Sequence, residues 1–150
     1  MRETAGSSAA SELTRFAATF YFKAGIVEDD VVQTDGSGLS RQDLVTPRAV
    51  VGLLHYAEAR PWFEVFFTSL PIAGMDGTLQ ERLKKTAAAG RIHGKTGSSD
   101  HAKTLSGFAE TLNGRRLIFS FLGNNQTSNS SESQDVLDGV CVAMIEELNF

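Results

Sequence analysis

The tripeptide Lys95-Thr96-Gly97 carries the most distinctive chemistry in this sequence, because it joins a lysine, a hydroxyl and a glycine. Such a tripeptide fits two unrelated kinds of site. It could close a phosphate-binding loop, in which backbone N–H groups surround the phosphates. It could also line the acyl-transfer site of a serine enzyme. The residues around the tripeptide decide between the two.

A phosphate-binding loop is excluded by spacing and by context. The pattern G-x-x-x-x-G-K-[ST] places its first glycine at position 89, where this chain has Ala89. A helix should then begin at the lysine. Instead, two runs rich in β-forming residues follow, 103–111 and 115–123, joined by Asn113-Gly114. Asn-Gly favours a type I′ hairpin turn, because both residues tolerate positive φ. The tripeptide is therefore predicted on or beside a strand that leads into a hairpin.

Composition sets few limits on function. Hydrophobic residues make up 41% and charged residues 21% of the 150 residues, as in ordinary globular domains. The net charge is −4, and we expect no nucleic-acid partner. The charges are unevenly distributed along the chain. Positions 81–103 hold six lysines and arginines and two acidic residues, and no lysine or arginine follows Arg116. The surroundings of Lys95 thus favour an anionic ligand, although Arg82, Lys84 and Lys85 are better explained as a solvated helix face.

The sequence gives no sign of a cofactor, a metal site or a membrane span. The three histidines and Cys141 lack metal-ligand spacing, so we expect neither metal nor cofactor. No apolar run reaches the roughly 20 residues of a spanning helix, and the polar first ten residues do not form a signal peptide. Cys141 lies in an apolar helical stripe and is predicted to be a buried thiol.

Periodicity and capping signals predict an α+β fold, in which an antiparallel sheet is covered by N-terminal and C-terminal helices. The chain is treated as one partial domain, 1–150, with a helical segment over about 8–90, strands over about 91–123 and a closing helix over about 133–148. Within the helical segment, Asp35–Gly38 is a tight turn and Thr46-Pro47 begins a helix. The expected helices cover 8–24, from 46 onward, 62–70 and 78–86, the last of which begins with the capping box Thr78–Glu81.

The apolar stripe of the closing helix is expected to face the sheet. Its members are Val136, Leu137, Val140, Cys141, Met144, Ile145 and Leu148.

Four stretches, taken in order, resemble the C-terminal part of the D-Ala-D-Ala carboxypeptidases. The resemblance is narrower to the class C low-molecular-mass penicillin-binding proteins, which also act as endopeptidases on peptidoglycan crosslinks. The resemblance implies that this chain has the C-terminal part of the penicillin-binding-protein and β-lactamase-like transpeptidase fold. The stretches are Thr34–Arg41 (TDGSGLSR), Leu44–Ala49 (LVTPRA), Leu70–Leu79 (LPIAGMDGTL), and Gly94–Ser98 (GKTGS) with Leu105–Phe108 (LSGF).

The resemblance implies a role for each residue of the tripeptide region. Lys95 would be a catalytic-site charge near the substrate's terminal carboxylate and the proton relay. Thr96 and Ser98 would bind that carboxylate through their hydroxyls. Gly97 would let the substrate backbone lie against the strand. The Ser98 backbone N–H would be one of two oxyanion-hole donors, and losing such a donor typically costs about 3 kcal/mol of transition-state stabilisation.

Two motifs of that family are missing from this chain. No serine stands three residues before any lysine, so S-x-x-K with its nucleophile is absent, and no S-x-N occurs. We therefore expect a C-terminal fragment of a serine-type D-Ala-D-Ala carboxypeptidase that is inactive by itself. Its parent would act in the periplasm or at the cell wall, on peptidoglycan stem peptides ending in D-Ala-D-Ala, and only the full-length enzyme would bind β-lactams. The incomplete sheet could pair into a strand-linked oligomer.

Two other functions remain open. The chain could be a catalytically silent module that binds peptidoglycan peptides or a protein partner. It could also be a different enzyme that uses Ser37 or Ser40 with His93. The second idea is weaker, because Gly36–Ser40 is not a G-x-S-x-G nucleophile elbow, and a structural role explains Ser40 and His93 better.

Overall fold

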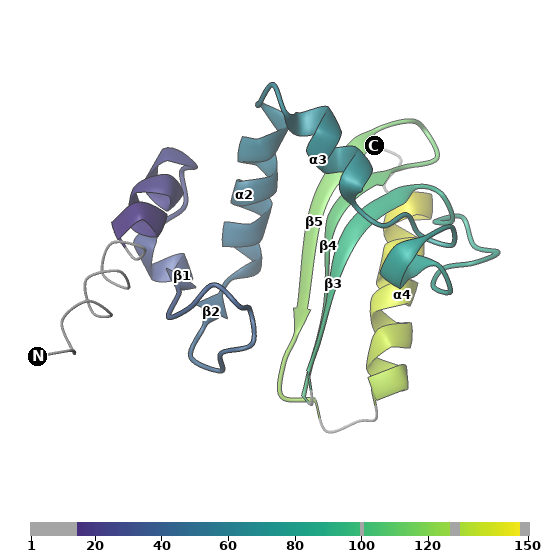
Figure 1. Ribbon diagram of the computed structural model, residues 1–150. Coiled ribbons are helices and arrows are strands. Elements are labelled where there is room, and N and C mark those ends of the chain that lie inside the picture. Colours follow the sequence, from purple (N-terminus) through teal and green to yellow (C-terminus); the bar gives the residue numbers. More distant parts are fainter. Residues whose placement is uncertain (1–14, 100, 127–129, 148–150) are drawn as a thin grey trace, which may run out of the picture. The chain divides into compact units, whose positions relative to one another are not determined.

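A computed structural model describes residues 15–99, 101–126 and 130–147 (Figure 1). The chain divides into two compact units, Met1–Tyr56 and Ala57–Phe150. The mixture of helices with an antiparallel sheet confirms the predicted α+β class. The prediction of a single domain stays a prediction.

The first unit holds a helix over residues 15–23 and a small two-stranded sheet ahead of a longer helix. The part of the first expected helix before residue 15 lies outside the described residues. The sheet and helices that follow are η1 (Glu28–Asp30), β1 (Val31–Val32), β2 (Leu44–Val45) and α2 (Pro47–Glu58). The expected helical segment therefore also contains two short strands, which pair antiparallel.

The start of α2 follows the sequence signal. The Ala49 backbone N–H donates to Thr46 Oγ1 at 3.1 Å, so Thr46 caps the helix as predicted. Two residues after Thr46, in the first turn of α2, the Arg48 guanidinium donates to both carboxylate oxygens of Asp30 at 2.8 Å. These hydrogen bonds hold the pKa of the Asp30 carboxyl below its usual value. They tie η1 to the first turn of α2.

The segment between β1 and β2 forms the predicted tight turn. The Ser37 backbone N–H and hydroxyl both donate to Asp35 Oδ1, at 2.8 and 2.9 Å. Gly38 has a φ of +74°, which favours glycine. The hydroxyls of Ser40 and Thr34 lie 3.0 Å apart. The two serines considered as nucleophiles thus have local structural partners.

The second unit is built on a three-stranded antiparallel sheet in the order β3-β4-β5. Its strands are β3 (Ile92–Ser99), β4 (Ala102–Glu110) and β5 (Arg116–Gly123). They confirm the strand region predicted over 91–123. The helices of this unit are α3 (Phe63–Ser69), the short η2 (Gly77–Leu79) and α4 (Ser130–Glu147).

The two faces of the sheet pack against different helices (Figure 1). Leu105 and Ala109 of β4 point into a buried cluster that includes Cys141 and Ile145 of α4. Phe108 points to the opposite face, because side chains alternate along a strand. There its ring contacts the ring of Phe63 of α3 at a centroid distance of 5.3 Å. The faces are called the α4 face and the α3 face below.

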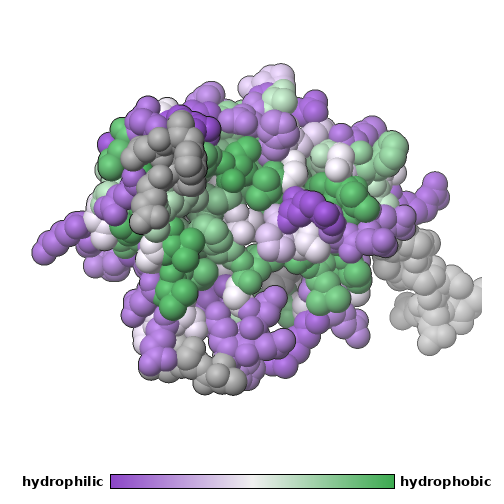
Figure 2. Space-filling view, turned by 180° about the vertical axis from the view of Figure 1, so that it is seen from behind, coloured by the Kyte–Doolittle hydropathy of each residue, from purple (hydrophilic) through white to green (hydrophobic). Residues whose placement is uncertain are grey.

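The closing helix is confirmed, but part of its predicted stripe is wrong. Cys141 and Ile145 are fully buried, whereas Val136 and Val140 are 66% and 44% exposed. Helix α4 contacts the narrow sheet chiefly through β4, so the buried stripe is narrower than the sequence implied. Figure 2 shows hydrophobic areas between hydrophilic ones on one face of the molecule. Leu148 lies outside the described residues.

Cys141 is the buried thiol that the sequence predicted. Burial, followed by the nearby Asp138 charge, raises the pKa of the Cys141 thiol to about 12. The reactive form of a cysteine is the thiolate, so this side chain is inert at neutral pH.

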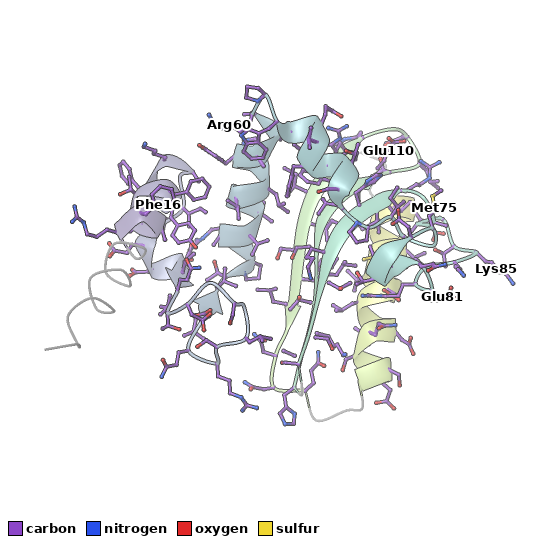
Figure 3. All side chains as sticks on the ribbon, viewed as in Figure 1. Phe16, Arg60, Met75, Glu81, Lys85 and Glu110 are labelled. Atoms are coloured by element: carbon purple, nitrogen blue, oxygen red, sulfur yellow. The ribbon has the colours of Figure 1, made fainter. Side chains whose placement is uncertain are left out.

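The helix expected over 78–86 is wrong. Only the 3₁₀ turn η2 forms, and Leu83 and Lys85 have positive φ of 62° and 60°, which no right-handed helix allows. The Thr78 hydroxyl accepts a hydrogen bond from Thr96 Oγ1 at 3.0 Å, rather than capping a helix. Turns replace the helix and bury Leu83 and the nearby Leu79. Figure 3 shows Lys85 at the outer tip of this irregular segment.

The hairpin between β4 and β5 forms where Asn113-Gly114 predicted it, but with another turn. Gly114 alone has positive φ, +80°, and Asn113 does not. The Gly114 N–H donates to Thr111 O at 2.9 Å, and the Thr111 N–H donates to Arg115 O at 2.9 Å. This is a three-residue loop that ends in a left-handed glycine, not a type I′ turn.

Within the parts of the chain that the structure describes, no helix combines the length and apolar character needed to cross a membrane.

The ion pair between Arg82 and Asp138 joins the irregular segment to α4 and generates a stability prediction. Their side chains are only 10% and 18% exposed and lie 2.5 Å apart. Asp138→Asn leaves a largely buried guanidinium without its counter-charge, so we expect the free energy of unfolding in urea to fall by about 3 kcal/mol. The matched control is Glu81→Gln, which breaks an exposed pair with Lys84 and should cost under about 1 kcal/mol. Equal losses from both variants would contradict this account.

Candidate functional site

The tripeptide lies in β3, at an edge of the three-stranded sheet. On its inner side β3 pairs with β4 in a continuous register, with Lys95 opposite Ser106, Gly97 opposite Thr104 and Ser98 opposite Lys103. This pairing fixes the direction of every backbone and side-chain group in the segment. The opposite, outer side of β3 is where a further chain could pair.

The outer edge of β3 is occupied at its beginning and open further along. The Ala73 N–H donates to Ile92 O at 2.9 Å, and the Gly94 N–H donates to Pro71 O at 3.0 Å. Backbone groups of an antiparallel strand point alternately to one side and the other. The N–H groups of Thr96 and Ser98 therefore point to the same outer edge as that of Gly94. Among the described residues, no backbone group bonds to either of them.

The side chains of the tripeptide region alternate between the two faces. Lys95 lies on the α3 face with Ser106, and Thr96 and Ser98 lie on the α4 face. Lys95 is exposed, and its Nζ donates to the Thr96 carbonyl oxygen at 2.5 Å. Because that carbonyl also belongs to the outer edge, the lysine charge sits beside the open backbone groups. Lys95 on the α3 face and Thr96 and Ser98 on the α4 face therefore all lie along the outer edge of β3.

Gly97 packs closely against the neighbouring strand β4. A Cβ placed on Gly97 would lie 2.4 Å from Thr104 Oγ1, well inside contact distance. A larger residue would displace Thr104 or part β3 from β4. The role expected for Gly97, close approach of a substrate backbone, stays a prediction.

Two residues outside the predicted set contact the site from the α4 face. The Thr78 hydroxyl bonds Thr96 Oγ1 at 3.0 Å, and Lys103 Nζ donates to Ser98 Oγ. Thr78 was assigned to a helix cap, which hid its contact across 18 residues. Lys103 lies opposite Ser98 through the register between β3 and β4, and no motif in the sequence indicates that register.

His93 has a structural environment. Its ring stacks on Phe67 of α3 at a centroid distance of 4.1 Å, and its Nδ1 is buried without a hydrogen-bond partner among the described residues. A general base is held by such a partner and reaches its nucleophile. The His93 ring has neither feature within its own unit.

Comparison with known proteins shows which family this chain belongs to. A family model described as the D-Ala-D-Ala carboxypeptidase 3 (S13) family matches residues 5–144. The chain belongs to this family. The resemblance drawn from the four sequence stretches is confirmed.

One relative in this family is a D-alanyl-D-alanine carboxypeptidase from Actinomadura sp. (strain R39). It is 37% identical over 127 residues, which are 81% of this chain and 23% of that protein. A penicillin-sensitive carboxypeptidase A from Dictyostelium discoideum is 30% identical over 75% of this chain and 23% of its own length. The chain therefore spans about a quarter of the curated relatives that it matches.

Solved structures agree on the fold. Penicillin-binding protein 4 from Haemophilus influenzae, in a complex with a β-lactam, superposes with a TM-score of 0.74 at 26% identity, over 85% of this chain and 31% of that chain. The TLA-1 β-lactamase superposes with a TM-score of 0.67 at 18% identity, over 88% of this chain and 55% of that one. The second likeness shows the fold alone. Together they confirm the penicillin-binding-protein and β-lactamase-like fold.

Gly97 of β3 and Gly107 of β4 should differ in how well they tolerate replacement by alanine. A Cβ on Gly107 would lie 2.1 Å from the His93 carbonyl oxygen, which is rigid backbone, whereas a Cβ on Gly97 would meet a hydroxyl that can rotate. We expect Gly107→Ala to lower the free energy of unfolding by about 3 kcal/mol or more, and Gly97→Ala by about 1 kcal/mol.

The control is Gly36→Ala, because a Cβ there meets nothing within 4 Å and should change stability by under about 1 kcal/mol. Adding Thr104→Ala to Gly97→Ala should restore the lost stability. Urea unfolding measures all four variants, and a cost at Gly97 equal to that at Gly107 would refute the steric reasoning.

Proposed function

We propose that this chain is the C-terminal part of a serine-type D-Ala-D-Ala carboxypeptidase or endopeptidase of peptidoglycan metabolism, and that it supplies the substrate-binding strand. The parent enzyme would work in the periplasm or at the cell wall. The observation that carries the proposal is the open outer edge of β3, where the N–H groups of Thr96 and Ser98 have no backbone partner among the described residues and lie beside the Lys95 ammonium.

An extended peptide can bind such an edge by adding a strand. Main-chain hydrogen bonds to an exposed sheet edge give affinity, and side-chain sites along it give specificity. In the proposed complex, the stem peptide runs alongside Thr96 and Ser98 and bonds to their outward backbone groups. Lys95, whose ammonium already reaches the Thr96 carbonyl, places a positive charge next to the peptide's terminal carboxylate.

The Ser98 N–H is suited to a second task, the stabilisation of an oxyanion. An oxyanion hole needs fixed donors aimed at the oxygen that gains charge in the transition state. The ladder to β4 holds this N–H rigidly, and it points away from the sheet with no backbone partner in the described part of the chain. The second donor would come from the backbone of the nucleophile.

The nucleophile itself is not supplied by these 150 residues, because no serine stands in an S-x-x-K motif. The chain would therefore bind substrate without cleaving it. An alternative role, a catalytically silent module for peptidoglycan peptides or a protein, uses the same open edge. Stereochemistry separates recognition of peptidoglycan from recognition of a protein, since a site for stem peptides must prefer D-alanine.

Binding of a diacetyl-lysyl-D-alanyl-D-alanine peptide tests the proposal. We expect it to shift the backbone amide signals of Thr96 and Ser98 in ¹⁵N NMR spectra, and the L,L peptide to shift them far less. Lys95→Met should weaken binding about tenfold, because a charge-assisted hydrogen bond is lost. Lys85→Met is the matched control and should bind as the unchanged chain does. Equal shifts with both stereoisomers would exclude the peptidase role.

Reaction with a fluorescent penicillin tests the missing nucleophile. We expect no covalent labelling of the purified chain in a denaturing gel, because removing a catalytic serine costs on the order of a million-fold in turnover. An intact relative that carries S-x-x-K serves as the positive control. A labelled band that survives denaturation would show that a nucleophile exists in this chain.

A further inference from the structure

The three-stranded sheet has a second edge, formed by β5, which the candidate site does not use (Figure 1). The Thr111 N–H donates to Arg115 O across the hairpin. Backbone groups alternate along an antiparallel strand, so the odd-numbered residues of β5 bond to β4. The even-numbered residues Ile118, Ser120 and Leu122 therefore turn their N–H and C=O groups outward. Among the described residues, no backbone group bonds to them.

The edge of β5 lacks the features that usually keep exposed strands apart. Native edge strands are protected by a charged side chain, a proline, a bulge or a covering segment. The residues Leu117–Gly123 (LIFSFLG) contain no charge and no proline, and their register with β4 is unbroken. The outer edge of β3 differs, because residues 71–73 bond its beginning and Lys95 lies beside its open part. Pairing with another strand of the same kind is therefore favoured at β5.

The sequence of β5 is complementary to itself about Ser120. When two antiparallel copies are related by a two-fold axis at Ser120, Ile118 lies opposite Leu122 of the second copy. All three of these residues direct their backbone groups outward, so each N–H of one copy meets a C=O of the other. On the α3 face, the pairing brings an isoleucine against a leucine on either side of the two serines. The register thus satisfies the open backbone groups and buries apolar side chains together.

The same register extends the hydrophobic core on the α4 face. Phe119 is buried in the cluster beneath α4, and Phe121 packs against that cluster, with the two ring centroids 5.1 Å apart. Across the axis, Phe119 lies opposite Phe121 of the second copy, so four rings would meet, and aromatic cross-strand pairs stabilise sheets. Arg116 falls opposite Asn124, which places no like charges against each other.

We propose that this chain forms a two-fold symmetric dimer in which β5 pairs with β5 of a second copy, joining two three-stranded sheets into one of six strands. The assembly is closed, because each copy uses its single β5 edge. The inference goes beyond the proposed function and does not depend on it, since the open edge of β3 lies on the other side of the sheet. The dimer leaves both β3 edges free, one at each end of the sheet, and is therefore bivalent for any peptide that binds there.

Sedimentation equilibrium of the 150-residue chain tests the dimer. One strand pair is at the small end of specific interfaces, below about 1,200 Å², so we expect a dissociation constant in the micromolar range. The mass should rise with concentration from one chain to two and stop there. Hydrogen exchange followed by ¹⁵N NMR should show that the N–H groups of Ile118, Ser120 and Leu122 become protected as the dimer forms. Those of Thr96 and Ser98 should keep exchanging.

Substitution of Ser120 tests the register. Ser120→Pro removes an outward N–H and leaves the bonds to β4 in place, so we expect it to weaken dimerisation at least about tenfold. The matched control is Ser120→Ala, which removes only the hydroxyl that bonds Ser106 and should dimerise as the unchanged chain does. If Ser120→Pro fails to fold, Ser120→Lys replaces it. Two lysines directly opposite each other should also weaken the dimer, and added salt should restore part of the loss.

Several results would overturn the proposal. One is a chain that stays monomeric up to millimolar concentration, including one whose β5 N–H groups are protected at every concentration because another part of the chain covers them. Another is a dimer that persists in both Ser120→Pro and Ser120→Lys. Protection that appears at Thr96 and Ser98, or growth beyond two chains, would show that β3 takes part in the pairing instead. The exchange measurement on the unchanged chain decides the matter even if every variant fails to fold.

Discussion

The hydrogen-bond ladder between β3 and β4 is the constraint on which the site depends. It uses the inward backbone groups of β3 and leaves those of Thr96 and Ser98 facing outward. It also places Lys95 on one face and the two hydroxyls on the other. A substrate that pairs with the outer edge would meet all of these groups. The site is therefore a property of the strand register more than of any single side chain.

The register in turn depends on close packing within the sheet. Gly94 and Gly107 face each other across β3 and β4, and a side chain on Gly107 would enter the His93 backbone. This contact lets the two strands approach above a buried cluster in which Ile92 and Leu105 are fully buried. On the other face, Phe108 and the rings of α3 hold the same strands. Both faces therefore fix the position of β3.

Much of this fold could be predicted because the deciding signals are local. Thr46-Pro47 begins α2 as its capping chemistry dictates, and apolar runs around Asn113-Gly114 place three strands within a few residues of their true ends. The order of the four stretches identified the family, which the family model confirms. Lys95 and Ser98 were found by that resemblance, and their catalytic roles stay predictions.

The errors occur where distant contacts outweigh local preference. The capping box at Thr78 predicts a helix, yet its hydroxyl bonds Thr96, 18 residues away. Periodicity alone cannot tell how wide a surface a helix meets, so Val136 and Val140 were assigned to the core although they are exposed. The contact between Lys103 and Ser98 depends on strand register, which no single motif reports. Such contacts need the assembled sheet before they can be recognised.

The attachment of β3 to residues 71–73 limits how this family can vary in length. The hydrogen bond between Gly94 and Pro71 fixes the start of this stretch. Adding or removing one residue between Gly94 and Ser98 would move each later side chain of β3 to the other face of the sheet, and each later N–H group to the other edge of the strand. One residue inserted before Lys95 would turn the Ser98 N–H toward β4 and move the Lys95 side chain to the α4 face. We therefore expect insertions and deletions in this short stretch to be rare among homologues. A change in the length of the turn between β4 and β5 would leave the register between β3 and β4, and so the faces of β3, unchanged.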